Sequence, residues 1–93
     1  MPAESTPPTL LVADDDPAVR QSLERTLARE GYSVLLAPDG QAAMERLREG
    51  GVDLLLSHLR MPGLNGLELL WEVKAAEPDV DVIMLTACGT VEA

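Results

Sequence analysis

The chain is poor in several residue types on which whole classes of protein depend. Its 93 residues include no Phe, and only one Trp, one Tyr, one Cys and one His. The single cysteine, Cys88, excludes an intramolecular disulfide and suits a reducing compartment. Because aromatic residues are so scarce, we expect a core built from Leu, Val, Ile, Ala and Met.

Basic residues and long apolar runs are also lacking. Seven Lys and Arg residues against sixteen Asp and Glu residues give a net charge of −9. This opposes nucleic-acid binding by the segment, because phosphate contacts need Lys and Arg. No apolar run approaches the ~20 residues that span a bilayer, and residues 1–8 lack the pattern of a signal peptide. We therefore expect a cytoplasmic protein, not bound to membranes, with a disordered leader at 1–8 and one domain at 9–93.

What the chain does contain is a regular alternation of apolar runs and amphipathic stretches. Four segments are expected to be buried strands: 9–13, 32–37, 52–57 and 80–85. Asp16, Asp39 and Asn65 are placed to cap the three intervening helices, and Thr90 looks like the start of a fourth. Right-handed crossovers then predict an α/β fold with an open parallel sheet and helices on both faces.

The helix after Asn65 carries two apolar stripes that cannot easily face the same sheet. One contains Leu67, Leu70 and Trp71, and the other contains Leu69, Val73 and Ala76. Either this helix has a broad buried face, or Trp71 is exposed and contacts a partner, since aromatic residues are enriched at interfaces. Trp71 is therefore a candidate interface residue.

Polar residues follow three of the predicted strands at their carboxyl ends. Asp14 and Asp15 follow the first strand, His58 the third and Thr86 the fourth. In a parallel sheet these ends meet at one edge, where binding sites lie. Neighbouring carboxylates repel each other unless water or a cation screens them. The acidic pair is either a surface helix start or a Mg²⁺ site, because Mg²⁺ prefers oxygen ligands and keeps several waters.

Three motifs together resemble a response-regulator receiver domain of bacterial two-component systems. They are residues 10–17 (LLVADDDP), 56–70 (LSHLRMPGLNGLELL) and 82–87 (VIMLTA). The resemblance covers about residues 9–93, and it implies a flavodoxin-like sheet with strand order 2-1-3-4-5. Residues 86–93 look like the receivers of sigma-54-dependent transcriptional activators. The site residues that the resemblance implies are a Mg²⁺ pair at Asp14 and Asp15, a switch hydroxyl at Thr86 and a loop with Pro62, Gly63 and Gly66.

The resemblance implies a phosphorelay module, not an enzyme, that receives phosphate from a sensor histidine kinase and regulates transcription. One departure changes this expectation. In receivers, the position of His58 holds the aspartate that accepts the phosphate, and here it is histidine. Imidazole is a poor ligand for Mg²⁺. We therefore expect a degenerate receiver in which ordinary phosphotransfer is lost, Mg²⁺ binding is at most weak, and regulation occurs by protein contact.

A second departure is the length of the match. Measured against the family, the chain lacks most of the fourth helix, the fifth strand with its lysine, and the fifth helix. Four strands and three full helices are therefore expected, in a C-terminally incomplete domain. An open fourth strand would present unpaired backbone groups. This predicts marginal stability or a homodimer through the exposed fourth-strand edge.

Several alternatives remain for His58. Its imidazolium could neutralise Asp14 and Asp15, it could join them in a transition-metal site, or it could itself be phosphorylated. The chain could also be a conventional receiver whose acceptor has been altered. A different class is a small metal-dependent α/β enzyme that uses Asp14, Asp15 and His58. That reading lacks a Gly-rich phosphate loop and a nucleophile elbow.

Overall fold

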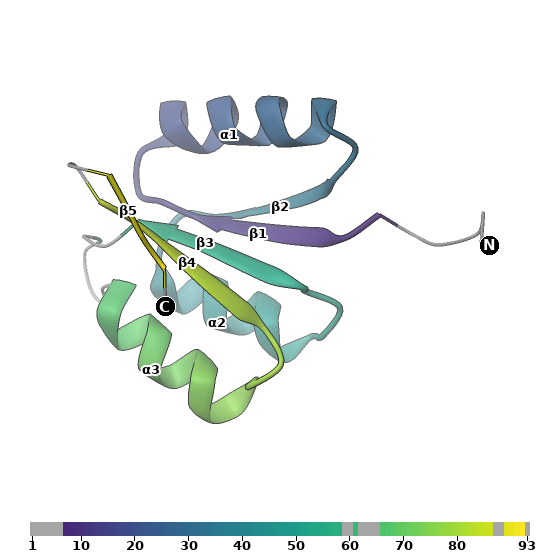
Figure 1. Cartoon of the computed structure of the whole chain (residues 1–93). Coiled ribbons are helices and arrows are strands. Elements are labelled where there is room, and N and C mark those ends of the chain that lie inside the picture. The colour runs from purple at the N-terminus through teal and green to yellow at the C-terminus, as the bar shows by residue number, and fades with distance from the viewer. Residues whose placement is uncertain (1–6, 59–60, 62–65, 87–88, 93) are drawn as a thin grey trace.

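The computed structural model describes residues 7–58, 61, 66–86 and 89–92. Its elements are β1 (Thr9–Ala13), α1 (Pro17–Arg29), β2 (Ser33–Ala37), α2 (Gly40–Arg48), β3 (Leu54–His58), α3 (Gly66–Ala76), β4 (Asp81–Thr86) and β5 (Gly89–Glu92). They form one sheet in the order β2-β1-β3-β4-β5, with α1 on one face and α2 and α3 on the other (Figure 1). Strands β1 to β4 are parallel. The predicted order 2-1-3-4 of the four parallel strands and the three helices are confirmed.

The end of the described chain differs from the prediction. Gly89–Glu92 is not a helix start but the antiparallel strand β5, which pairs with β4 from Ile83 to Thr86. The backbone groups along β4 offer hydrogen bonds to this segment, and β-branched Thr90 and Val91 suit an extended conformation. The expectation of an exposed fourth-strand edge is therefore wrong over Ile83–Thr86, and a dimer cannot form through that stretch while β5 occupies it.

Two side chains fix the beginnings of α1 and α2 as the sequence predicts. The backbone N–H of Ala18 donates to Oδ1 of Asp16 at 2.9 Å, with Pro17 at the first helical position. The N–H of Ala42 donates to Oδ1 of Asp39 at 2.8 Å. Each bond satisfies a backbone donor that has no partner within its helix. The third predicted cap, Asn65, lies outside the described residues.

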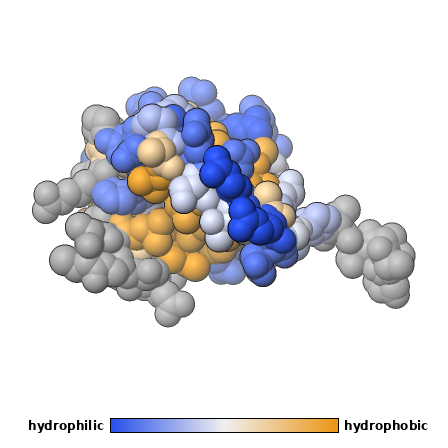
Figure 2. Space-filling view, turned by 90° about the horizontal axis from the view of Figure 1, so that it is seen from above, coloured by the Kyte–Doolittle hydropathy of each residue, from blue (hydrophilic) through white to orange (hydrophobic). Residues whose placement is uncertain are grey.

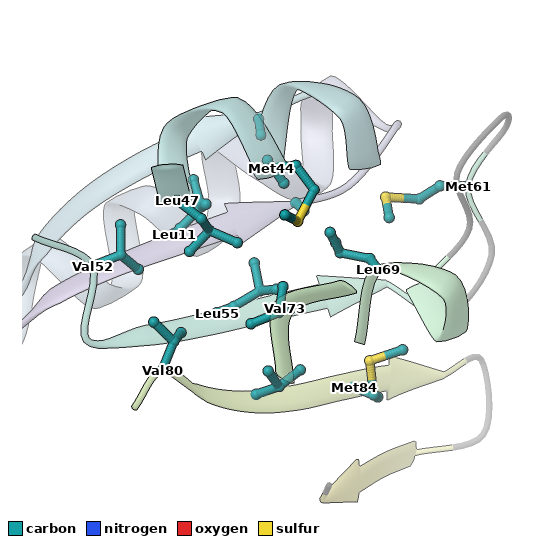
Figure 3. Close-up of a cluster of buried hydrophobic side chains, with 14 residues drawn as sticks. Leu11, Met44, Leu47, Val52, Leu55, Met61, Leu69, Val73, Val80 and Met84 are labelled. Atoms are coloured by element: carbon teal, nitrogen blue, oxygen red, sulfur yellow. The ribbon is translucent and has the colours of Figure 1, made fainter. Parts of the chain in front are cut away.

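The core lies between the sheet and the α2–α3 layer. Alternate residues of a strand point to opposite faces, and those on this face interlock with apolar side chains of both helices (Figure 3). Most of these side chains are at most 3% exposed: Leu11, Ala13, Ala37, Ala43, Met44, Leu47, Leu55, Leu69, Val73, Val82 and Met84. As the composition predicts, no aromatic side chain of the described residues takes part.

The opposite face of the sheet is covered less completely. Helix α1 lies over β1 and β2 and has no buried residue of its own. Leu56 and Ile83 alternate with the core residues Leu55 and Met84, so they face the α1 side, where they are only half-buried. Viewed from this side, hydrophobic residues gather beside a hydrophilic surface (Figure 2). Helices lie on both faces as predicted, but the two layers bury unequal amounts of apolar surface.

Helix α3 resolves the question of its two apolar stripes. Leu69 and Val73 are fully buried, whereas Leu67 is 52% exposed and Trp71 is 73% exposed. The buried face is therefore narrow, and the interpretation of a broad buried face is wrong. The exposure of Trp71 is confirmed, while its contact with a partner stays a prediction. Within the described ranges, none of the helices has the length and apolar character needed to span a lipid bilayer.

Candidate functional site

The loop between β1 and α1 is built around the carboxylate of Asp14. This residue is 2% exposed, and its backbone N–H donates to the carbonyl of Ala37 at 3.1 Å. Its Oδ1 accepts a hydrogen bond from the N–H of Asp16 at 2.9 Å. On the outside of the loop, Nη1 of Arg20 donates to the carbonyl of Asp14 at 2.7 Å. The loop is thus held by bonds to β2 and to the first turns of α1.

The second carboxylate oxygen of Asp14 has a different environment. Oδ2 is buried and has no hydrogen-bond partner in the described part of the chain. Leaving a buried polar group without a partner costs on the order of 1–3 kcal/mol, and more when the group is charged. Such an oxygen is suited to a cation or an ordered water, and Mg²⁺ takes oxygen ligands of this kind. The residues present therefore fit one protein ligand of a Mg²⁺ site.

Asp14 and Asp15 do not share one environment. Asp15 is exposed, and so is Asp16, whose side chain is engaged in capping α1. Only Asp14 combines burial with an unpartnered oxygen. Sequence reasoning placed the pair at the correct edge, but adjacent residues on a turning backbone point in different directions. The distribution of burial between them had no signal in the sequence.

His58 is the last residue of β3, and it is half-buried. Ala13 and Ser57 are register partners in the parallel pair β1–β3, so Asp14 and His58 each follow a paired position. His58 in turn pairs with Leu85 of β4, which precedes Thr86. The carboxyl ends of β1, β3 and β4 therefore bring the backbones of Asp14, His58 and Thr86 to one edge of the sheet, as predicted.

Two neighbouring residues fix the end of β3. Ser57 is fully buried, and its hydroxyl donates to the carbonyl of His58 at 3.1 Å. Met61, in the loop that follows, is 7% exposed and packs into the core (Figure 3). Sequence reasoning missed this anchor, because the same stretch of sequence also contains Leu59 and Leu64 and does not show which apolar side chain is buried. Of the loop residues predicted to matter, Gly66 begins α3, while Pro62 and Gly63 lie outside the described residues.

The transition-metal alternative finds no support in this geometry. Among the described residues, no three His, Cys, Asp or Glu side chains lie close enough together to hold a metal ion. His58, Asp14 and Asp15, all of them described, therefore do not form the three-ligand site that this alternative and the enzyme reading require. A Mg²⁺ ion that keeps most of its waters needs fewer protein ligands.

The parallel sheet, with an acidic loop after β1 and a polar residue at the end of β3, has the arrangement that the receiver motifs of the sequence imply. The family model for the response regulator receiver domain matches residues 10–93. The chain belongs to this family.

Named relatives and solved structures agree with this assignment. The chain is 40% identical over 85 residues to response regulator MprA of Mycolicibacterium vanbaalenii, covering 91% of this chain and 37% of that protein. It is also 40% identical over 85 residues to transcriptional regulatory protein GlrR of Escherichia coli K12, covering 91% and 19%. The chain thus spans less than two fifths of these relatives.

Among solved structures, the response regulator TrrA of Thermotoga maritima in complex with Mg²⁺-BeF has a TM-score of 0.83 and 36% identity. That match covers 86% of this chain and 70% of TrrA. TrrA in complex with the histidine kinase ThkA matches with a TM-score of 0.81 and 36% identity, covering 86% and 69%.

Proposed function

We propose that the chain is a degenerate receiver module of a cytoplasmic two-component response regulator. In this proposal it is not phosphorylated in the usual way, and it regulates transcription through protein contacts. The observation that carries the proposal is His58, which ends β3 beside the loop of the buried Asp14. This is the position at which the family resemblance expects the phosphate-accepting aspartate.

The chemistry of imidazole supports this view. An aspartate at position 58 would supply both the nucleophilic oxygen of an acyl phosphate and a hard oxygen ligand for Mg²⁺. Imidazole supplies neither, and its protonated form is no ligand at all. Asp14 offers one buried oxygen and Asp15 an exposed carboxylate. We therefore propose that Mg²⁺ binds weakly at Asp14 and Asp15, and that the switch role of Thr86 is not driven by phosphate.

The comparison with solved structures also supports a proposal about the binding partner of this chain. TrrA, 36% identical to this chain, has been solved in complex with a histidine kinase. We propose a sensor histidine kinase or another signalling protein as the partner here, with the exposed Trp71 as a candidate contact. The net charge of −9 favours a protein partner over nucleic acid.

Intact-mass measurement tests the loss of ordinary phosphotransfer. The protein is incubated with Mg²⁺ and a small phosphodonor, beside a receiver that carries the aspartate as positive control. We expect the control to gain one phosphate and this chain to gain none. An acid-labile, base-stable adduct on His58 would show that the histidine itself accepts phosphate, and a base-labile adduct would place an acyl phosphate on another carboxylate. Either result would contradict the proposal.

A further inference from the structure

Arg20 of α1 is bound to both ends of the acidic segment that follows β1. Its guanidinium Nη1 donates to the carbonyl of Asp14 at 2.7 Å, and its backbone N–H donates to the carbonyl of Asp16 at 3.0 Å. The side chain is half-buried near the start of the helix. One residue thus ties residues 14–16 to α1 through a side-chain bond and a backbone bond.

The guanidinium of Arg20 binds a backbone carbonyl, although three carboxylates belong to the same segment. Within the part of the chain that the structure describes, Arg20 forms no ion pair with any of them. An arginine paired with these carboxylates would neutralise them and compete with a metal ion for their oxygens. Bound to the backbone instead, Arg20 leaves Oδ2 of Asp14 without a hydrogen-bond partner and leaves Asp15 exposed.

The carbonyl that Arg20 binds belongs to the peptide unit joining Asp14 to Asp15. Because a peptide unit is planar, the bond fixes the orientation of this unit and so restricts the direction in which the Asp14 side chain leaves the backbone. We propose that Arg20 is a positioning residue, which holds this peptide in the orientation that keeps Oδ2 of Asp14 available to Mg²⁺. This role rests on the proposed Mg²⁺ binding at Asp14 and Asp15, and it is independent of the chemistry of His58.

Charge and geometry give opposite predictions for the removal of this guanidinium. A positive group near a cation site repels Mg²⁺, so a purely electrostatic effect of removing it would be tighter binding. Loss of positioning would weaken binding, because metal affinity falls by about 10–100-fold when a group that orients a ligand is removed. We expect Arg20→Met, which keeps an apolar side chain of similar length, to raise the Mg²⁺ dissociation constant about tenfold.

A Mg²⁺ titration followed by NMR measures this constant on the folded protein. The chemical shifts of the backbone amides in residues 13–16 report binding, so a change in stability alone does not alter the result. Arg25→Met is the matched control, because it removes the same charge from an exposed position of the same helix. It should leave the constant within about twofold of the wild-type value, since an exposed charge is screened by salt.

Hydrogen exchange in metal-free buffer tests the positioning without the ion. The N–H of Asp16 donates to Oδ1 of Asp14, so a loosened loop should exchange this hydrogen faster. The amide of Leu55, in the core strand β3, reports global unfolding. In Arg20→Met we expect exchange at Asp16 to rise by a larger factor than exchange at Leu55, and in Arg25→Met we expect no such difference.

Two results would overturn this role for Arg20 while leaving the proposed metal site intact. One is Mg²⁺ binding by Arg20→Met that is as tight as in the wild type, or tighter. The other is exchange at Asp16 that rises no more than exchange at Leu55. A wild-type chain that bound no Mg²⁺ at all would instead overturn the proposed metal site, and the role of Arg20 with it.

Discussion

At the scale of single residues, the two carboxylate oxygens of Asp14 have different environments. Oδ1 of Asp14 closes the loop by accepting from the N–H of Asp16, and Oδ2 is buried without a partner. If Mg²⁺ binds as proposed, one side chain both closes the loop and holds the metal. Asp15 is exposed, so its side chain can change rotamer. A change of rotamer at Asp14 would break the hydrogen bond from the N–H of Asp16 that closes the loop.

The different environments of the two oxygens predict how Asp14→Asn changes the stability of the protein. An amide keeps the oxygen that accepts from Asp16, and it removes the charge from the buried position. In metal-free buffer we expect the free energy of unfolding to stay the same or rise by about 1 kcal/mol. We expect Mg²⁺ to stabilise the wild type slightly, and this gain should disappear in the variant, since only binding to the native state produces it. Urea unfolding with EDTA and with Mg²⁺ measures both effects.

Asp16→Asn provides the control for this experiment. It removes a charge from the same loop, and asparagine caps a helix about as well as aspartate. Its stabilisation by Mg²⁺ should therefore stay close to the wild-type value. An Asp14→Asn variant that retained the full Mg²⁺ effect would exclude Asp14 as the main metal ligand.

The positions of some single residues could be predicted from the sequence, and the burial of others could not. The position of His58 at a strand end followed from the apolar run before it and the polar residue itself. Trp71 and Leu69 lie two residues apart on one helix, and the apolar pattern could not decide which of them faces the sheet. That choice depends on how α3 rotates against α2 and β4, where Leu69 and Val73 join the core, and this packing is not a local property.

At the scale of elements, β3 shows how differently the two faces of the sheet are buried. Leu55 is fully buried in the α2–α3 core, and its neighbour Leu56 is half-buried on the α1 side. Leu55→Ala should therefore lower the free energy of unfolding by about 2–5 kcal/mol, through lost burial and a cavity. Leu56→Ala should cost only about 1 kcal/mol, because solvent already reaches its side chain. Urea unfolding of the two variants measures the difference, and equal losses would mean that α1 seals its face as tightly as α2 and α3.

At β5, the local sequence pattern predicted a helix where the structure has a strand. Thr90 resembles a helix N-cap, and the family pattern favours a helix there. In the structure, Gly89–Glu92 pairs with Ile83–Thr86 of β4 instead. A pattern of four residues holds little helical stability of its own, so pairing with a neighbouring strand decides the conformation. Helices α1 and α2, which are longer and have aspartate caps, began where the sequence predicted.

At the scale of the whole molecule, the order of elements was predictable because short apolar runs and amphipathic stretches alternate along the chain. Parallel pairing and right-handed crossovers then leave few topologies. The predicted order of the four parallel strands follows from the receiver motifs, and the structure agrees with it. The shared edge of Asp14, His58 and Thr86 is a consequence of that order. The distribution of burial between the faces was not predictable, since it depends on how far each helix layer extends.

The central claim is that the receiver site lacks its phosphoacceptor because position 58 holds histidine. The most direct test is His58→Asp, incubated with Mg²⁺ and a small phosphodonor and examined by intact mass beside the wild type. We predict that the variant gains one base-labile phosphate and that the wild type gains none. A variant that stays unmodified while remaining folded would contradict the claim, because the loss of phosphotransfer would then arise elsewhere in the site.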